Sequence, residues 1–271
     1  MEPGLEKKKE EVFEPPPALE EEKPKDASVD ENRPKPGEFL GWSILIVPDD
    51  YKGPLPHANW IYQRYKDEYE KLYNDIAAGS TSIKISENSG TTNGDAADVK
   101  YPGFQDKVLK SLKRLLTTKS GRTLLKSIAE GGFDVSIRPS TQGLATTRRD
   151  NDANAKNGTG SASTLYFDPH FSDKTVKVFD KNGKELATPF FLALGHELIH
   201  AAHNQDGINA RDQAPSDAAW GNKEEENAID GSTGVTENAL RKELGLGRRF
   251  GHGGTVTGKR TKTIAGGKAG G

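Results

Sequence analysis

The sequence feature that most limits how this chain can fold is an apolar stretch that encloses His196-Glu197-Leu198-Ile199-His200. Thr188 is a suitable N-cap, and Pro189 suits the first helical position, where its missing N–H costs nothing. The pattern therefore predicts a helix from Pro189 to His203 or Asn204, buried by the apolar residues on either side of the motif.

The polar residues of this helix are typical of a metal site. His196 and His200 are four residues apart, so both imidazoles lie on one face and can bind the same ion. Glu197 can then act as the base toward a water on that metal. The chain has no cysteine, so any metal must be held by His, Asp or Glu. The motif predicts Zn²⁺, and the alternative is a pair of helix histidines that are only hydrogen bonded.

A catalytic zinc needs three protein ligands and one open position. The sequence leaves two places open for the third ligand: the acidic cluster Glu224-Glu225-Glu226, and Glu237. Three adjacent glutamates cannot all face one metal, so at most two of the cluster have a role, and the cluster could also be a solvated charge run.

His203 lies one turn beyond His200 and is a further histidine to place. The extended pattern HExxHxxGxxH needs Gly at position 203 and His at position 206. This chain has His203 and Asp206 there, which excludes that protease class. We expect His203 to be exposed or to lie behind the metal ligands.

The rest of the chain predicts one globular domain between two tails. Residues 1–37 hold 7 of the 15 prolines and alternating charge runs, which predicts disorder. The segment 253–271 is rich in Gly and Lys and is expected to be flexible, leaving 38–252 as the folded domain. A net charge of −2 gives no case for nucleic acid, and no apolar run is long enough to span a membrane. We therefore expect the protein to bind neither nucleic acid nor a membrane, and we expect it to be a monomer.

Hydrophobic periodicity predicts a mixed α+β domain. Helical spacing is found at 59–76, 104–116 and 122–129, and strand patterns at 39–47, 133–137, 164–167 and 175–179. The segment 139–162 shows no period, so we expect a long loop that contacts substrate, acts as a lid or is disordered. A substrate strand is expected to pair near Thr164–Phe167.

At this point the chain resembles a known group, the NleD-like zinc metalloproteases among bacterial type III secretion effectors. The resemblance covers about residues 101–252, and its HELIHA portion is also similar to the clostridial neurotoxin light chains. It rests on the following segments: Phe104–Leu109, Gly121–Leu125, Phe133–Ile137, Thr164–Pro169, Gly195–Ala201 and Thr236–Leu246.

The resemblance implies a zincin-like domain with the HExxH helix beside a small sheet, and it implies roles for single residues. His196 and His200 would bind zinc, and Glu197 would be the catalytic base. In the neurotoxin-like pattern the second glutamate of a pair precedes Gly by five residues and binds the zinc. Glu225-Glu226 followed by Gly231 fits, which selects Glu226 as the third ligand and Glu225 as its neighbour.

The resemblance also extends to the end of the domain, where relatives carry Arg-x-x-Tyr. This chain has Arg249-Phe250-Gly251-His252, so Arg249 matches and His252 replaces the tyrosine. Arg249, with His252, would stabilise the tetrahedral oxyanion.

The function implied is a zinc metalloendopeptidase, secreted and delivered into the host cell cytoplasm, that cleaves a host protein. The resemblance suggests mitogen-activated protein kinases as a substrate class. Two alternatives stay open: a zinc hydrolase of a non-protein amide or ester, and a non-catalytic interaction protein with a zinc-stabilised fold.

Overall fold

The computed structural model of the chain describes residues 69–90, 98–141, 145–171, 176–232 and 234–253. The predicted tail 1–37, the predicted strand at 39–47 and all but the first residue of the predicted tail 253–271 lie outside these residues. Within them, no helix is both long enough and apolar enough to cross a membrane.

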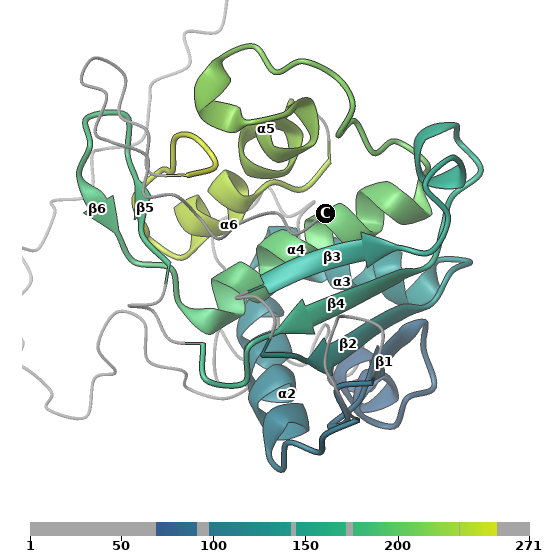
Figure 1. Cartoon of the computed structure of the whole chain (residues 1–271). Helices are drawn as coiled ribbons and strands as arrows, with labels where there is room; N and C mark the ends of the chain where they lie inside the picture. The colour runs from purple at the N-terminus through teal and green to yellow at the C-terminus, as the bar shows by residue number, and fades with distance from the viewer. Residues whose placement is uncertain (1–68, 91–97, 142–144, 172–175, 233, 254–271) are drawn as a thin grey trace, which may run out of the picture. The chain divides into compact units, whose positions relative to one another are not determined.

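A four-stranded sheet forms the centre of the described chain (Figure 1). Its strands run in the order β1-β2-β4-β3, in which β1 and β4 are parallel to β2 and β3 is antiparallel to β4. Their bounds are Ile83–Ile85 for β1, Val135–Pro139 for β2, Ala145–Arg149 for β3 and Ser163–Phe167 for β4. The strands predicted at 133–137 and 164–167 are thereby confirmed as β2 and β4.

The expectation of a long irregular loop over 139–162 was wrong. This segment contains β3 and the short 3₁₀ helix η2, Asn154–Lys156. The strand carries no alternating apolar signal because, of its five residues, only Thr147 is buried. It also forms the edge of the sheet, whereas Thr164–Phe167, where we expected a substrate to pair, lies between β2 and β3.

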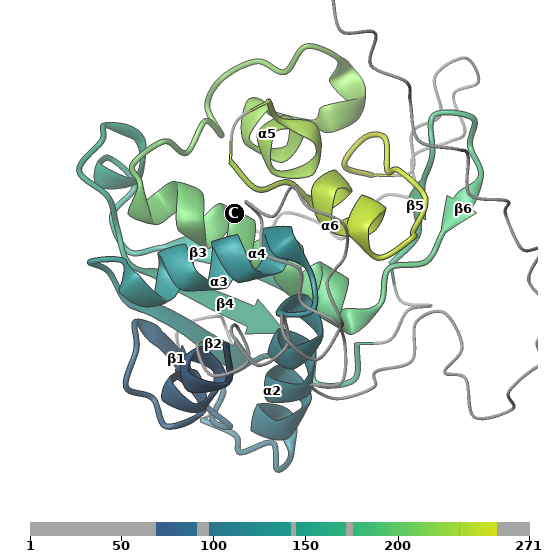
Figure 2. The ribbon, with the colours of Figure 1, turned by 180° about the vertical axis from the view of Figure 1, so that it is seen from behind.

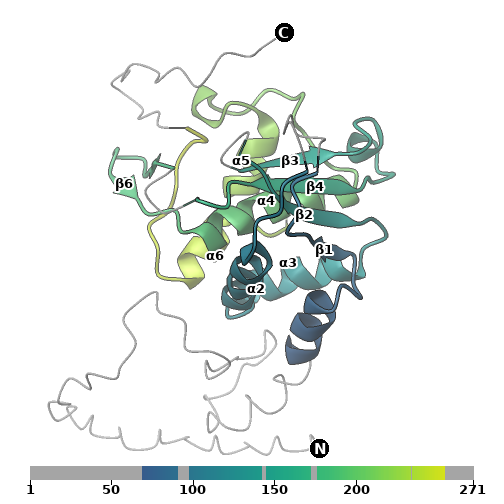
Figure 3. The same ribbon diagram turned by 60° about the horizontal axis from the view of Figure 1, so that its bottom comes forward.

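Three helices cover one face of this sheet (Figures 2 and 3): α2, Phe104–Leu115; α3, Lys119–Glu130; and α4, Phe190–Gln205. Both α2 and α3 occur where the helical spacing predicts them. The helices bury their apolar faces with strand residues such as Ile137 and Leu165 in a single core. The visible part of the predicted aromatic helix, 69–77, also packs on this core through Tyr69, Leu72 and Tyr73.

The helix α4 is buried along most of its length, which explains why its sequence is apolar on nearly all sides. Gly195 allows close packing, since a Cβ there would lie 3.0 Å from Leu240 and 3.2 Å from Leu115. The predicted cap at Thr188 was wrong. Pro189 occupies the N-cap position, and the Thr188 hydroxyl instead accepts a hydrogen bond from Arg241.

In the described part of the chain, a two-stranded hairpin precedes α4, and three short helices follow it. The hairpin consists of β5, Val178–Phe179, and β6, Glu185–Leu186. After α4 come η3, Ala218–Trp220; α5, Lys223–Asp230; and α6, Glu237–Glu243. Both α5 and α6 contact α4. The predicted α+β class, with a small sheet beside the HExxH helix, is confirmed.

Candidate metal centre and active site

The helix α4 places the two motif histidines side by side in the interior. Their rings lie nearly perpendicular, with centroids 4.7 Å apart, and the two Nε2 atoms are separated by 3.1 Å. His196 is 7% exposed and His200 is 5% exposed. Two buried imidazole nitrogens that face each other at this distance need a common partner.

Glu225 of α5 completes this group from outside the motif helix. Its Oε2 lies 3.3 Å from His196 Nε2 and 3.4 Å from His200 Nε2. This oxygen is buried and forms no hydrogen bond with any described residue. Zinc bonds of about 2.0–2.1 Å at the tetrahedral angle separate two ligand atoms by about 3.3–3.4 Å. The three donor atoms therefore fit a zinc ion in both chemical type and spacing.

Glu226, which the resemblance selected as the third ligand, is not brought to the histidines. Its carboxylate accepts hydrogen bonds from the backbone N–H and the hydroxyl of Ser216, at 2.8 and 2.5 Å, and pairs with Lys223. On α5 it therefore points away from Glu225. Of the two glutamates, the structure therefore brings Glu225, and not Glu226, close to both histidines.

The apolar residues of α5 carry a signal for this choice. Ala228 and Ile229 are fully buried, and they follow Glu224 and Glu225 by four residues. Residues four apart share a helix face, so Glu224 and Glu225 belong to the buried face of α5.

Glu224 lies behind His200. Its Oε1 accepts hydrogen bonds from His200 Nδ1 at 2.7 Å and from His203 Nδ1 at 2.8 Å. Its Oε2 accepts a hydrogen bond from the backbone N–H of Ala210 at 3.0 Å. Since an ionised carboxylate only accepts, His200 carries a proton on Nδ1, and its Nε2 lies on the side of Glu225.

Glu237, the other candidate ligand, has the corresponding place behind His196. Its Oε2 lies 3.1 Å from His196 Nδ1, an ion-pair distance without the direction of a full hydrogen bond. Arg249 and Arg241 bind the two carboxylate oxygens at 2.5 and 2.7 Å. Glu237 thus orients a histidine from behind and does not join the three-atom group.

The carboxylates and imidazoles shift one another's pKa values. Burial alone would lower the pKa of His200, but the charge of Glu225 and the hydrogen bond to Glu224 raise it to about 10. Burial would raise the pKa of Glu224, but the hydrogen bonds from His200 and His203 lower it to about 2. The pKa of Glu225 is also lowered, against the effect of burial, by the charge of His200. The centre is therefore built to hold a positive charge between ionised carboxylates.

Glu197 faces a different neighbour. Its Oε2 accepts a hydrogen bond at 2.7 Å from the hydroxyl of Thr147, which also lies 3.0 Å from the carbonyl oxygen of Glu197. Thr147 belongs to the edge strand β3, so the sheet fixes the carboxylate of the motif helix. No periodicity in the sequence pointed to Thr147.

The two residues predicted at the end of the domain also reach this centre. Arg249 is buried, and its Nε and Nη2 donate to the carbonyl oxygens of Gly251 and His252 while Nη1 binds Glu237. His252 is half exposed, with Nε2 at 3.4 Å from Glu225 Oε2. Its backbone N–H donates to Ala219 in η3, which holds this segment in place.

A cavity of about 260 Å³ opens onto the centre. It is bordered by the motif residues His196 and Glu197, by Arg249 and His252, and by an apolar wall. The apolar wall consists of Ala145, Phe171, Val176 and Ala193. Together with Glu237, which also borders it, five of the candidate residues named from the sequence thus line one space large enough for a side chain of a bound ligand.

Comparison with known proteins identifies a family for this chain. A profile of the Peptidase_M91 family, described as "Effector protein", matches residues 92–251, which is more than half of the chain. The chain belongs to this family. Membership confirms the resemblance to this family of effector proteins. No curated protein matches the chain.

Solved structures similar to this family member include two neurotoxin catalytic domains. The catalytic domain of Clostridium botulinum neurotoxin serotype F matches with a TM-score of 0.41 and 15% identity, covering 60% of this chain and 58% of that one. The botulinum neurotoxin type D light chain matches with a TM-score of 0.33 and 17% identity, covering 49% and 47%. The chain thus spans less than two thirds of either structure.

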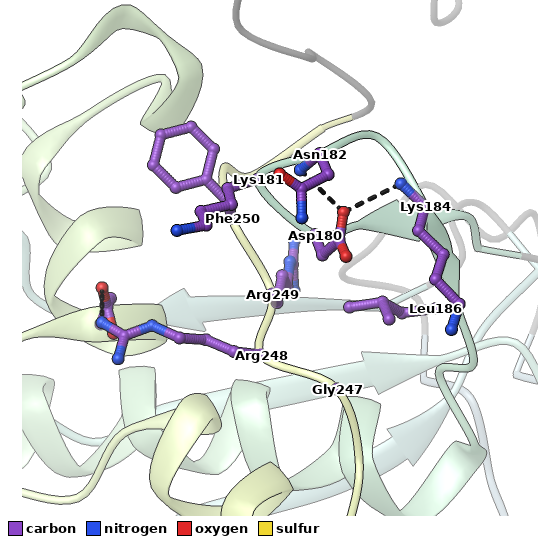
Figure 4. A pocket seen from close by; sticks show the side chains of 10 residues that line it. Asp180, Lys181, Asn182, Lys184, Leu186, Gly247, Arg248, Arg249 and Phe250 are labelled. Atoms are coloured by element: carbon purple, nitrogen blue, oxygen red, sulfur yellow. Dashed lines mark hydrogen bonds and ion pairs between the residues drawn. The ribbon is translucent and has the colours of Figure 1, made fainter.

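A second cavity, of about 520 Å³, is bordered by the β5–β6 hairpin and by the segment that contains Arg249 (Figure 4). Its acidic groups are already engaged. Asp180 accepts hydrogen bonds from the backbone N–H groups of Asn182 and Lys184, and Asp230 is paired with Arg248. Of the candidate catalytic residues, Glu197 and His252 border the smaller cavity, and Arg249 borders both.

Proposed function

We propose that this chain is a zinc-dependent metalloendopeptidase that acts as a monomer on a host protein, after secretion and delivery into the host cell cytoplasm. The observation that carries the proposal is the convergence of His196, His200 and Glu225 beside Glu197, at the end of an open cavity. The effector family supports the route to the host.

His196, His200 and Glu225 would hold the zinc ion. The buried Glu225 Oε2, which has no hydrogen-bond partner among the described residues, supports this assignment. When bound, zinc would polarise the scissile carbonyl and lower the pKa of water in the site. Glu224 and Glu237 would keep both imidazoles oriented, as carboxylates behind metal-binding histidines do.

Glu197 would act as the general base. It takes a proton from the attacking water and later passes it to the leaving nitrogen. The hydroxyl of Thr147 fixes the carboxylate oxygen, so the proton acceptor does not need to reorganise during the reaction.

Arg249 and His252 would stabilise the developing oxyanion from the opposite side of the cavity. Arg249 is held rigidly by Glu237 and by two carbonyl oxygens, and it borders the cavity with its positive charge. The half-exposed imidazole of His252 can donate a hydrogen bond where relatives carry a phenol. A charge that is fixed before the reaction stabilises the transition state most effectively.

The substrate would bind in extended form along β3. This strand is the edge of the sheet, and no described strand pairs with its other side. Its residue Ala145 borders the cavity, and Thr147 contacts the base. Backbone pairing of a peptide with this edge would place a peptide bond beside Glu197.

The resemblance supplies mitogen-activated protein kinases as the substrate class to test first. Host cell extract treated with the zinc-loaded protein is analysed by proteome-wide labelling of new protein N-termini, with Glu197→Gln as the matched inactive variant. We expect new termini with the wild type and none with the variant. If the wild type yields no new termini while it binds zinc, the peptidase proposal is wrong.

A further inference from the structure

We infer that His203 is a positioning residue of the metal centre, which acts on the ligand His200 through their shared partner Glu224. The inference rests on the proposed zinc site. It concerns a histidine that the HExxH motif does not include and that never reaches the active-site cavity.

The geometry places both histidines on one oxygen. The Nδ1 atoms of His200 and His203 lie 2.7 and 2.8 Å from Oε1 of Glu224. His203 is 7% exposed, and Glu224 is fully buried. A buried ionised carboxylate keeps its orientation only while its donors are present, and His203 is one of three.

The two metal-binding histidines have matching supports. Behind His196, Glu237 is held by Arg241 and Arg249. Behind His200, Glu224 is held by His203 and by the backbone N–H of Ala210. His203 thus holds the carboxylate of Glu224 as the two arginines hold that of Glu237. Within the described residues, it is the only side chain besides His200 with a hydrogen bond to Glu224.

His203 cannot contact the substrate that occupies the active-site cavity. It borders a separate cavity of about 550 Å³, lined also by residues of α3 such as Thr123 and Leu124, and not the cavity that contains Glu197. For a metal held by His196, His200 and Glu225, an effect of His203 would therefore pass through Glu224. It would be seen as a change in zinc affinity, because a misoriented Glu224 no longer fixes the tautomer and ring direction of His200.

The test compares His203→Leu, which removes the donor, with His203→Asn, whose side-chain amide can donate from nearly the position of Nδ1. Zinc affinity is measured by competition with a chromophoric chelator. We expect a loss of about 10- to 100-fold for His203→Leu and recovery of most of that loss in His203→Asn. Asp206 borders the same cavity and forms no hydrogen bond to Glu224 that the described structure shows, so Asp206→Asn should leave the zinc affinity unchanged.

Two further measurements separate positioning from damage to the fold. The thermal midpoint of each zinc-free variant shows whether it folds, and a double variant with Glu224→Gln shows whether His203 acts through Glu224. If it does, His203→Leu weakens zinc binding much less in the Glu224→Gln background than in the wild type. Equal losses in both backgrounds would overturn the inference.

The outcomes also distinguish this inference from the proposed function. If the wild type binds no zinc, the proposed function fails. If the wild type binds zinc and folded His203→Leu binds it equally well, or His203→Asn is as weak as His203→Leu, only the role of His203 is refuted.

Discussion

Replacement of Glu225 by Gln is the sharpest test of the centre, because its neighbour Glu226 provides a matched control. The Oε2 of Glu225 lies 3.3–3.4 Å from both histidine Nε2 atoms. Glu226 is instead bound to Ser216 and Lys223. The two residues are adjacent on α5, carry the same charge and are changed by the same isosteric substitution.

The expected magnitude follows from the ligand count. Loss of a partner behind a metal ligand costs about 10- to 100-fold in metal affinity. In the proposed site Glu225 is one of three direct donors and supplies the only negative charge among them. Glu225→Gln should therefore lower the zinc affinity by more than about 100-fold, or roughly 2.7 kcal/mol. For Glu226→Gln we expect the zinc affinity to change by no more than about twofold, because its carboxylate binds Ser216 and Lys223 and does not reach the histidines.

The assay is a zinc titration in competition with a chelator of known affinity, together with the metal content after dialysis. The thermal midpoints of both zinc-free variants confirm that they fold. The reasoning is refuted if Glu226→Gln loses zinc while Glu225→Gln retains it, which would restore the ligand selected from the sequence pattern.

Three other predictions address the base, the carboxylate behind His200 and the backbone after α4. Thr147→Val should lower the rate of peptide hydrolysis roughly 10- to 100-fold without loss of zinc, because Glu197 loses its fixed orientation. Thr147→Ser keeps the hydroxyl and should retain activity, so equal rates for both variants would contradict the role of Thr147. The pKa of Glu224 is lowered from 4.5 to about 2, so the stability that ionised Glu224 contributes to the fold is present above pH 4.5 and is lost as the pH falls through 2. The free energy of unfolding of the zinc-free protein should therefore depend less steeply on acid pH in Glu224→Gln than in the wild type, and an identical slope would refute the assignment. Gly207 has φ +69°, and a Cβ there would lie 2.6 Å from the backbone of Gly158, whereas Gly245 has φ +68° and open space around it. Urea unfolding should show that Gly207→Ala lowers the free energy of unfolding by about 1–3 kcal/mol more than Gly245→Ala does.

Local patterns in the sequence were sufficient for several elements. The helices α2 and α3 occur where apolar residues recur at helical spacing, and β2 and β4 where they alternate. Each of these elements buries one face in the same core, so the pattern and the packing agree. The strand β3 lacked such a pattern because only Thr147 among its five residues is buried.

The cap of α4 shows how tertiary contacts override a local preference. Thr188 followed by Pro189 has the sequence of an N-cap and a first helical residue. In the structure the hydroxyl of Thr188 accepts from Arg241 of α6, which comes from 53 residues later in the chain. A hydrogen bond to a buried guanidinium is stronger than a cap to a neutral N–H, so the helix begins at Phe190 without a side-chain cap.

The sequence by itself determined the pair His196 and His200 with Glu197 between them, because positions i and i+4 share a face of any α-helix. Only the tertiary structure shows that Glu225, and not Glu226, lies beside the two histidines, which depends on the rotation of α5 against α4. The same holds for Thr147 on Glu197, and for Glu224 and Glu237 behind the histidines. These contacts join segments that are far apart in the chain, and no local spacing encodes the distance between them.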